Sequence, residues 1–158
     1  MNKFFQIIFV ILIALLQITI MPFLSFYGVW PNLILILVVM LILNGFNEEG
    51  FIAAGVGGLV MEFASIYFFG FYSLVFVAVA VILYFLNSRF LNEPNFYLSL
   101  AILAIFVFVY DGIFLLLTPN MSWSTIIFNI AYSLLIAWPT YHLLSYYHKR
   151  INETELTI

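Results

Sequence analysis

Long runs of apolar residues dominate the chain, and short turns rich in glycine, proline, asparagine or glutamate separate them. Six runs are long enough to cross about 30 Å of hydrocarbon, which takes about 20 helical residues, or fewer where interfacial aromatic residues extend the reach. We therefore expect transmembrane helices at 4–24, 29–46, 51–69, 71–87, 96–117 and 123–144. Residues 1–148 would form a single transmembrane domain, and residues 149–158 a short cytoplasmic tail.

The runs are apolar on every side, which favours helices over the strands of a membrane barrel. Barrel strands would alternate polar and apolar residues over segments of about ten residues. The predicted fold class is therefore an all-α integral membrane protein, a bundle of six transmembrane helices. Turns are expected at Gly28, Gly45 and Gly70, and Pro22 and Pro139 are expected to end or kink helices.

The composition indicates that this chain is embedded in lipid. Of its 158 residues 66% are hydrophobic and only 7% are charged, and its mean hydropathy is +1.22. A soluble monomer of this length has too little interior to hide so much apolar surface. A net charge of −3 argues against a nucleic-acid-binding protein, and the lack of cysteine excludes disulfide frameworks and thiolate zinc sites.

The placement of positive charge predicts the orientation in the membrane. Cytoplasmic loops favour lysine and arginine. If the N-terminus is cytoplasmic, six spans place all four basic residues, Lys3, Arg89, Lys149 and Arg150, on the cytoplasmic side, and the outer loops carry no charge. Both termini are therefore predicted to be cytoplasmic.

Glu62 and Asp111 are the only charged residues within the predicted spans. A carboxylate near the bilayer centre costs about 2.5–3.5 kcal/mol, so each must face protein or water. The spans place both at similar depth toward the outer surface, as neighbours or in one polar pocket. They would serve as hydrogen-bonded packing residues, in ion or proton traffic, or as a catalytic pair that shares a proton. Candidate partners of Asp111 are Tyr110, Thr118, Asn129 and Tyr132.

Small residues recur every fourth position along the third predicted helix, in line with Glu62. Gly50, Ala54 and Gly58 lie on this stripe, which is typical of a close-packing face in membranes. The helix that packs there would come from this chain or from another subunit.

Motifs of the common enzyme classes are missing. The chain contains no HExxH, P-loop or GxGxxG motif. His142 and His148 lie among aromatic residues at the cytoplasmic end, which is typical of an interfacial belt rather than of a metal site. We expect no catalytic residues, no metal and no cofactor.

A set of residues in the first half of the chain has a distinctive order and spacing: Leu16-Gln17, Pro22, Gly28, Pro31-Asn32-Leu33, Gly50, Gly58-Leu59, Glu62, Gly70 and Leu74. This pattern resembles the bacterial rod shape-determining protein MreD family, in which LQ is followed by PDL, GLxxD and PLG. Asn32 and Glu62 replace the aspartates of that pattern, and Phe69 stands where proline precedes the last glycine. The resemblance covers about residues 15–86.

The resemblance implies a non-enzymatic, multi-pass subunit of the cell-wall elongation machinery in the bacterial cytoplasmic membrane. Such a subunit contacts membrane lipid, pairs with an MreC-like protein, and is linked to MreB filaments and a RodA-type synthase. The family is also similar in architecture to the substrate-binding subunits of energy-coupling-factor transporters. This similarity implies an alternative function, a small-solute-binding subunit of a transporter.

On the assembly hypothesis, Gly50, Ala54 and Gly58 seat a helix, and Glu62 and Asp111 fix its register by hydrogen bonds. In addition, Pro31 and Asn32 would start and orient the second helix.

Overall fold

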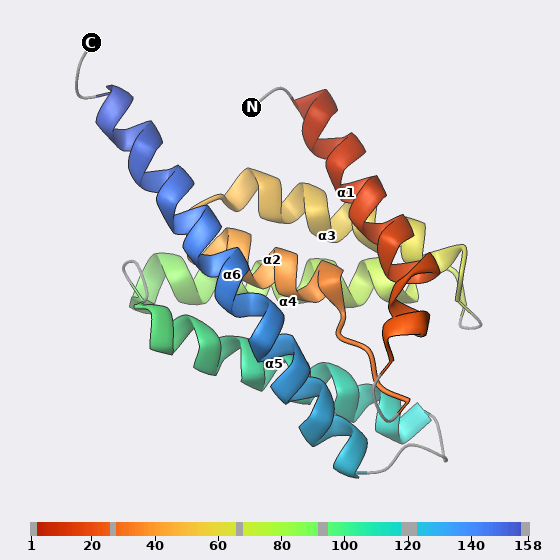
Figure 1. The fold of residues 1–158 in the computed structure, drawn as a ribbon. Helices are drawn as coiled ribbons and strands as arrows, with labels where there is room; N and C mark the ends of the chain where they lie inside the picture. The colour runs from red at the N-terminus through yellow and green to blue at the C-terminus, as the bar shows by residue number, and fades with distance from the viewer. Residues whose placement is uncertain (1–2, 26–27, 66–67, 92–94, 118–122, 156–158) are drawn as a thin grey trace.

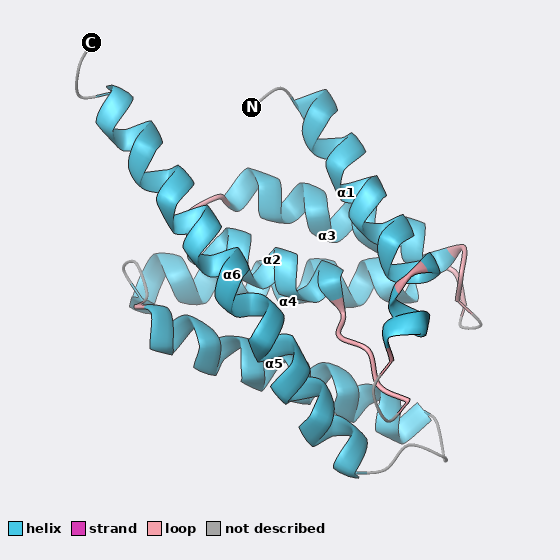
Figure 2. Ribbon diagram, viewed as in Figure 1, coloured by secondary structure: helices cyan, strands magenta, loops and turns pink. Residues whose placement is uncertain are grey.

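The structure is a computed structural model that describes residues 3–25, 28–65, 68–91, 95–117 and 123–155. Thr118 and the side chains of His148, Lys149 and Arg150 lie outside the described part. Within it the chain is helical and has no strand (Figure 2). The α-helices are Lys3–Thr19 (α1), Leu33–Leu43 (α2), Asn47–Glu62 (α3), Phe71–Leu86 (α4), Phe96–Leu117 (α5) and Trp123–Glu155 (α6).

Three of the described helical segments are long and apolar enough to cross a membrane. They are Phe71–Leu91, Phe96–Leu116 and Trp123–Tyr147, with mean hydropathies of 2.1, 2.4 and 1.2. The first of them includes a π-helix at Asn87–Leu91 that continues α4. The apolar helices α1 and α2 are shorter, at 17 and 11 residues, and α3 has 16 residues. The predicted all-α class is confirmed, with three candidate spans.

Several helix ends differ from the predicted ones. α1 ends at Thr19 rather than at residue 24, because Pro22 lies in the first turn of a separate 3-10 helix, Met21–Leu24. α6 continues to Glu155, so the first seven residues of the predicted tail, 149–155, are helical, because nothing after Pro139 interrupts the helix. Pro139 itself lies inside α6. The predicted bounds of α5, 96–117, are confirmed.

The short helix α2 is the centre of the bundle. It contacts every other α-helix, and nearly all of its side chains are buried. A helix buried on all sides needs no polar face, which explains why its sequence is apolar without periodicity. At about 1.5 Å per residue, the 11 residues of α2 are too few to cross the hydrocarbon. Non-helical segments precede and follow this helix.

Successive helices alternate in direction between two ends of the bundle. In Figure 1 the C-terminal ends of α2 and α4 lie to the left, and those of α3 and α5 lie to the right. Contacts at the left end agree: the Asn87 amide donates to the Ile42 carbonyl at 2.9 Å, and Phe46 contacts Tyr147. The expected turns at Gly28, Gly45 and Gly70 are confirmed by positive φ angles of 74°, 85° and 101°.

Candidate functional site

The small-residue stripe of α3 is a packing face, and this chain itself covers it. Gly50, Ala54 and Gly58 are buried. A Cβ atom at Gly58 would lie 2.6 Å from the Ser73 Cα of α4, and one at Gly50 would collide with the Ile42 side chain of α2. Of the two possible sources of the packing helix, the structure therefore provides helices from the same chain.

Glu62 is the last residue of α3 and lies against the start of α4. The predicted helix extended to residue 69, but i→i+3 hydrogen bonds from the Phe63, Ala64 and Ser65 amides end it here. The Glu62 side chain is only 6% exposed, and its Oε1 accepts a hydrogen bond from the Ser73 amide at 3.0 Å. The first amides of a helix have no partner within the helix, so this carboxylate stabilises the start of α4.

Asp111 joins α5 to α6 through an asparagine. The Asn129 Nδ2 donates to both carboxylate oxygens of Asp111, at 3.0 Å and 2.8 Å. The Ser133 hydroxyl in turn donates to the Asn129 Oδ1 at 3.4 Å. Asp111 is 2% exposed, so this group of side chains is buried within the bundle. Among the expected partners of Asp111, Asn129 is confirmed.

The start of α2 is held by a side chain from α1. Asn32 caps α2 as predicted, since its Oδ1 accepts from the Leu35 amide at 3.1 Å. The Gln17 Oε1 accepts from the Ile34 amide at 3.0 Å, and the Gln17 Nε2 donates to the Asn32 Oδ1 at 3.1 Å. Pro31 is fully buried beside this cap. The first-turn amides of Ile34 and Leu35, which have no partner within the helix, are thereby satisfied inside the protein.

The Gln17–Asn32 pair and the Asp111–Asn129 pair line the same cavity, which has a volume of about 340 Å³. Its polar lining consists of Gln17, Asn32, Asp111, Thr125 and Asn129. Its aromatic lining consists of Trp30, Tyr72, Tyr110 and Phe114, and Gly28, Val29 and Met61 complete the wall. Glu62 is absent from this lining, and no hydrogen bond joins it to Asp111. The structure therefore does not bring the two acids together in a shared pocket or as a proton-sharing pair.

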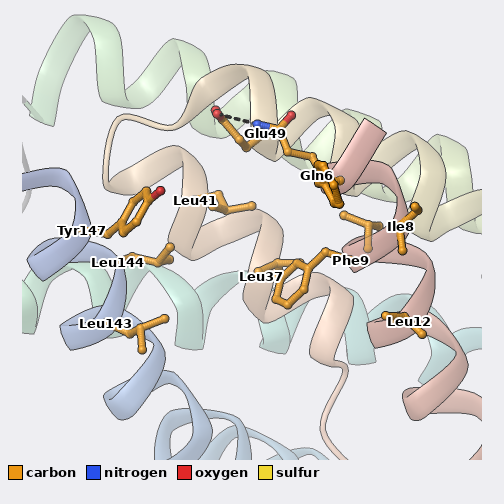
Figure 3. Close-up of a pocket in the computed structure, with 12 residues that line it drawn as sticks. Gln6, Ile8, Phe9, Leu12, Leu37, Leu41, Glu49, Leu143, Leu144 and Tyr147 are labelled. Carbon is orange, nitrogen blue, oxygen red and sulfur yellow. Dashed lines mark hydrogen bonds between the residues drawn. The ribbon is translucent and has the colours of Figure 1, made fainter. Parts of the chain in front are cut away.

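A second hollow, of about 500 Å³, is a groove between α1 and α6 with α2 as its floor (Figure 3). Apart from one polar pair, its lining is apolar or aromatic: Phe5, Ile8, Phe9, Val10, Leu12, Leu37, Leu41, Leu143, Leu144 and Tyr147. The polar pair lies at one end, where the Gln6 amide donates to the Glu49 Oε1 at 3.0 Å. Beyond it, an exposed ion pair joins Lys3 to Glu48 at 3.2 Å.

The two glutamines of α1 were not among the predicted site residues, although the sequence carries a signal for them. Gln6, Val10, Ala14 and Gln17 are the buried residues of this helix. Their spacing of four, four and three residues places them on one face. Because a glutamine side chain lies at each end of this buried face, and buried amides need hydrogen-bond partners, the pattern indicates polar partners at both ends of the bundle.

At the end of the bundle that holds the polar pair, His142 packs among aromatic rings. It stacks on Phe96 with centroids 5.2 Å apart and lies near Trp138 and Tyr141. Among the residues whose placement is described, no three histidine, aspartate or glutamate side chains are grouped so as to hold a metal ion.

Comparisons with protein-family models, with curated proteins and with solved structures found no match for this chain. The resemblance to the MreD family therefore rests on the residues of the sequence alone.

Proposed function

We propose that this chain is a membrane-embedded assembly subunit that seats a transmembrane helix of a partner protein in the groove between α1 and α6. The observation that carries the proposal is the groove itself: an apolar hollow of about 500 Å³ with a helix on each side and a helix as its floor. By the resemblance to MreD, the partner is an MreC-like protein with a single span. The complex is then linked to a RodA-type synthase and to MreB filaments.

The alternation of helix direction supports six membrane crossings with both termini in the cytoplasm. Lys3 and Arg89 lie at the same end of the bundle, because Lys3 pairs with Glu48 at the start of α3 and Arg89 follows the end of α4. This end is the cytoplasmic one by the preference of lysine and arginine for that side. The host membrane is the bacterial cytoplasmic membrane.

The other candidate docking face is already occupied. The Gly50, Ala54 and Gly58 stripe of α3 is buried against α2 and α4, so it is closed to a second protein. In the groove, by contrast, Phe9, Leu12 and Leu143 are more than half exposed. In lipid, a helix that fits such a groove closely is held there by van der Waals packing.

Charge at the cytoplasmic end of the groove indicates the chemistry of the partner. Glu48 and Glu49 both lie in the first turn of α3, next to the groove, and Lys3 neutralises only Glu48. A single-span partner with basic residues just inside the membrane would place positive charge beside Glu49. Such residues are common at this position because of the positive-inside preference.

Co-purification of the two membrane proteins tests the proposal. Leu143→Trp would fill the groove and should reduce the recovery of an MreC-like partner at least several-fold. Leu135→Trp is the matched control, because Leu135 lies on the same helix, is 67% exposed, and is absent from the groove lining. Equal recovery with both variants would contradict the proposal.

A second candidate function is favoured by the polar cavity. A cavity of about 340 Å³ with buried polar side chains is of the size that small ligands occupy. The chain would then be the solute-binding subunit of a membrane transporter. Retention of a small molecule through purification, identified by mass spectrometry of the denatured protein, would support this function.

A further inference from the structure

We infer that the polar cavity binds a small organic cation, with its ammonium group between the Asp111 carboxylate and the aromatic wall. This inference deepens the solute-binding candidate by naming the ligand class, and it rests on that candidate. It does not depend on the groove between α1 and α6, because the two hollows share no lining residue.

The charge of the cavity lining is the first step. Asp111 is the only charged residue among the twelve that line the cavity, and no lysine, arginine or histidine is among them. The one ion pair in the described part of the chain, Lys3 with Glu48, lies at the other end of the bundle. A carboxylate inside the membrane region is stabilised by a positive partner, and here the protein supplies none.

The second step is the hydrogen bonding of Asp111. Both of its oxygens accept from the Asn129 amide, which leaves each oxygen free to accept a further bond. The amides of Gln17 and Asn32 bond to each other and to the start of α2, so they contribute shape and no charge. The carboxylate is therefore the group of this lining that would attract a cation.

The third step is the aromatic wall beside this carboxylate. The ring of Phe114 lies 4.8 Å from that of Tyr110 and 5.7 Å from that of Tyr72, and all three line the cavity. Trp30 is 45% exposed, so it forms the rim, whereas Asp111 is deeply buried. Aromatic faces attract organic cations, and cages of aromatic rings are the usual sites for quaternary ammonium groups.

Titration of the purified full chain in detergent with choline chloride tests the inference. Binding is followed by calorimetry and by tryptophan fluorescence, at constant ionic strength with sodium chloride as the reference. The matched probe is the neutral analogue of choline in which carbon replaces the quaternary nitrogen. We expect choline to bind at least tenfold more tightly than this analogue.

Variants separate the charge of Asp111 from its structural role. Asp111→Asn should lower the affinity for choline at least tenfold. The double variant Asp111→Asn with Asn129→Asp restores it in large part, because residue 129 also lines the cavity and the hydrogen-bonded pair is kept. Glu48→Gln removes the same charge from an exposed position and should leave binding unchanged.

Each contrary outcome has a distinct meaning. Equal binding of choline and its neutral analogue, or unchanged choline binding by Asp111→Asn, would overturn the inference and leave the solute-binding candidate standing. If a protein that unfolds cooperatively binds neither choline nor its neutral analogue, the inference is also overturned. If the protein purifies with no retained small molecule, that result counts against the solute-binding function itself.

Discussion

Gly58 of α3 and Ser73 of α4 are in backbone contact: a Cβ atom at Gly58 would lie 2.6 Å from the Ser73 Cα and 2.9 Å from its amide nitrogen. One helical turn further along α3, Glu62 accepts a hydrogen bond from the same amide. The glycine allows the approach, and the carboxylate satisfies the amide that this approach buries. The two residues together fix the position of α4 against α3.

Gly58→Ala should therefore destabilise the protein by about 1–3 kcal/mol, because a methyl group there meets backbone that cannot move aside. Gly55→Ala is the matched control. Nothing lies within 4 Å of a Cβ atom at Gly55, and alanine is the better helix former by about 1 kcal/mol. Thermal unfolding in detergent should show a lower midpoint for the first variant and an equal or higher midpoint for the second. Equal midpoints would show that α3 and α4 are not in close contact.

Asp111→Asn should be tolerated better than Asp111→Leu. Asparagine can exchange hydrogen bonds with Asn129, whereas leucine leaves the Asn129 amide buried without an acceptor. An unsatisfied buried group costs about 1–3 kcal/mol. The yield of folded protein and its unfolding midpoint measure the difference. An equal loss in both variants would show that folding requires the negative charge itself.

Gln17→Leu should destabilise the start of α2, because the Ile34 amide and the Asn32 cap both lose a partner. The expected cost is about 1–3 kcal/mol for the amide left buried and unpaired. Thr19→Val is the control, since the Thr19 hydroxyl bonds only to the Leu15 carbonyl of its own helix and is exposed. Hydrogen exchange at Ile34, followed by mass spectrometry, should accelerate in the first variant alone.

Sequence reasoning predicted the elements that depend on local signals. The bounds of α5 and the three glycine turns were confirmed. A long apolar run predicts a membrane helix, and glycine is the residue that most readily adopts a positive φ, so both signals are local. The Asn32 cap was confirmed for the same reason. The spacing of small residues on α3 predicted a packing face, and Gly50 and Gly58 of this stripe lie buried against α2 and α4.

Features that depend on distant residues were not predictable in this way. The hydrogen bond from the Ser73 amide to the Glu62 carboxylate joins residues eleven positions apart, and it depends on how α4 packs against α3 rather than on a local signal. The apolar sequence of α2 predicted a span but gave no indication that five helices surround it. The link between Gln17 and Asn32 became visible only once the two helices were placed together.

The alternating direction of the helices predicts which residues face each side of the membrane. The chain has no cysteine, so single cysteines can be introduced without a background. Ser25 and Ser88 are both exposed and lie at opposite ends of the bundle, after α1 and after α4. In intact cells a membrane-impermeant maleimide should label Ser25→Cys and leave Ser88→Cys unlabelled until the membrane is opened. The reverse pattern would contradict the proposed orientation, and labelling of both would contradict the number of crossings.

The measurement that tests the proposed docking of a partner helix most directly is photo-cross-linking in native membranes from a probe at Phe9, which is half-exposed and lines the groove. A second probe at Ile105, which is 60% exposed against 53% for Phe9 and lies on α5 outside the groove, serves as the reference. We expect the first probe to give a defined adduct with a membrane protein that has one span and basic residues on its cytoplasmic side, and the second to give lipid adducts alone. Lipid adducts alone from both positions, or the same protein adduct from both, would contradict a partner helix seated between α1 and α6.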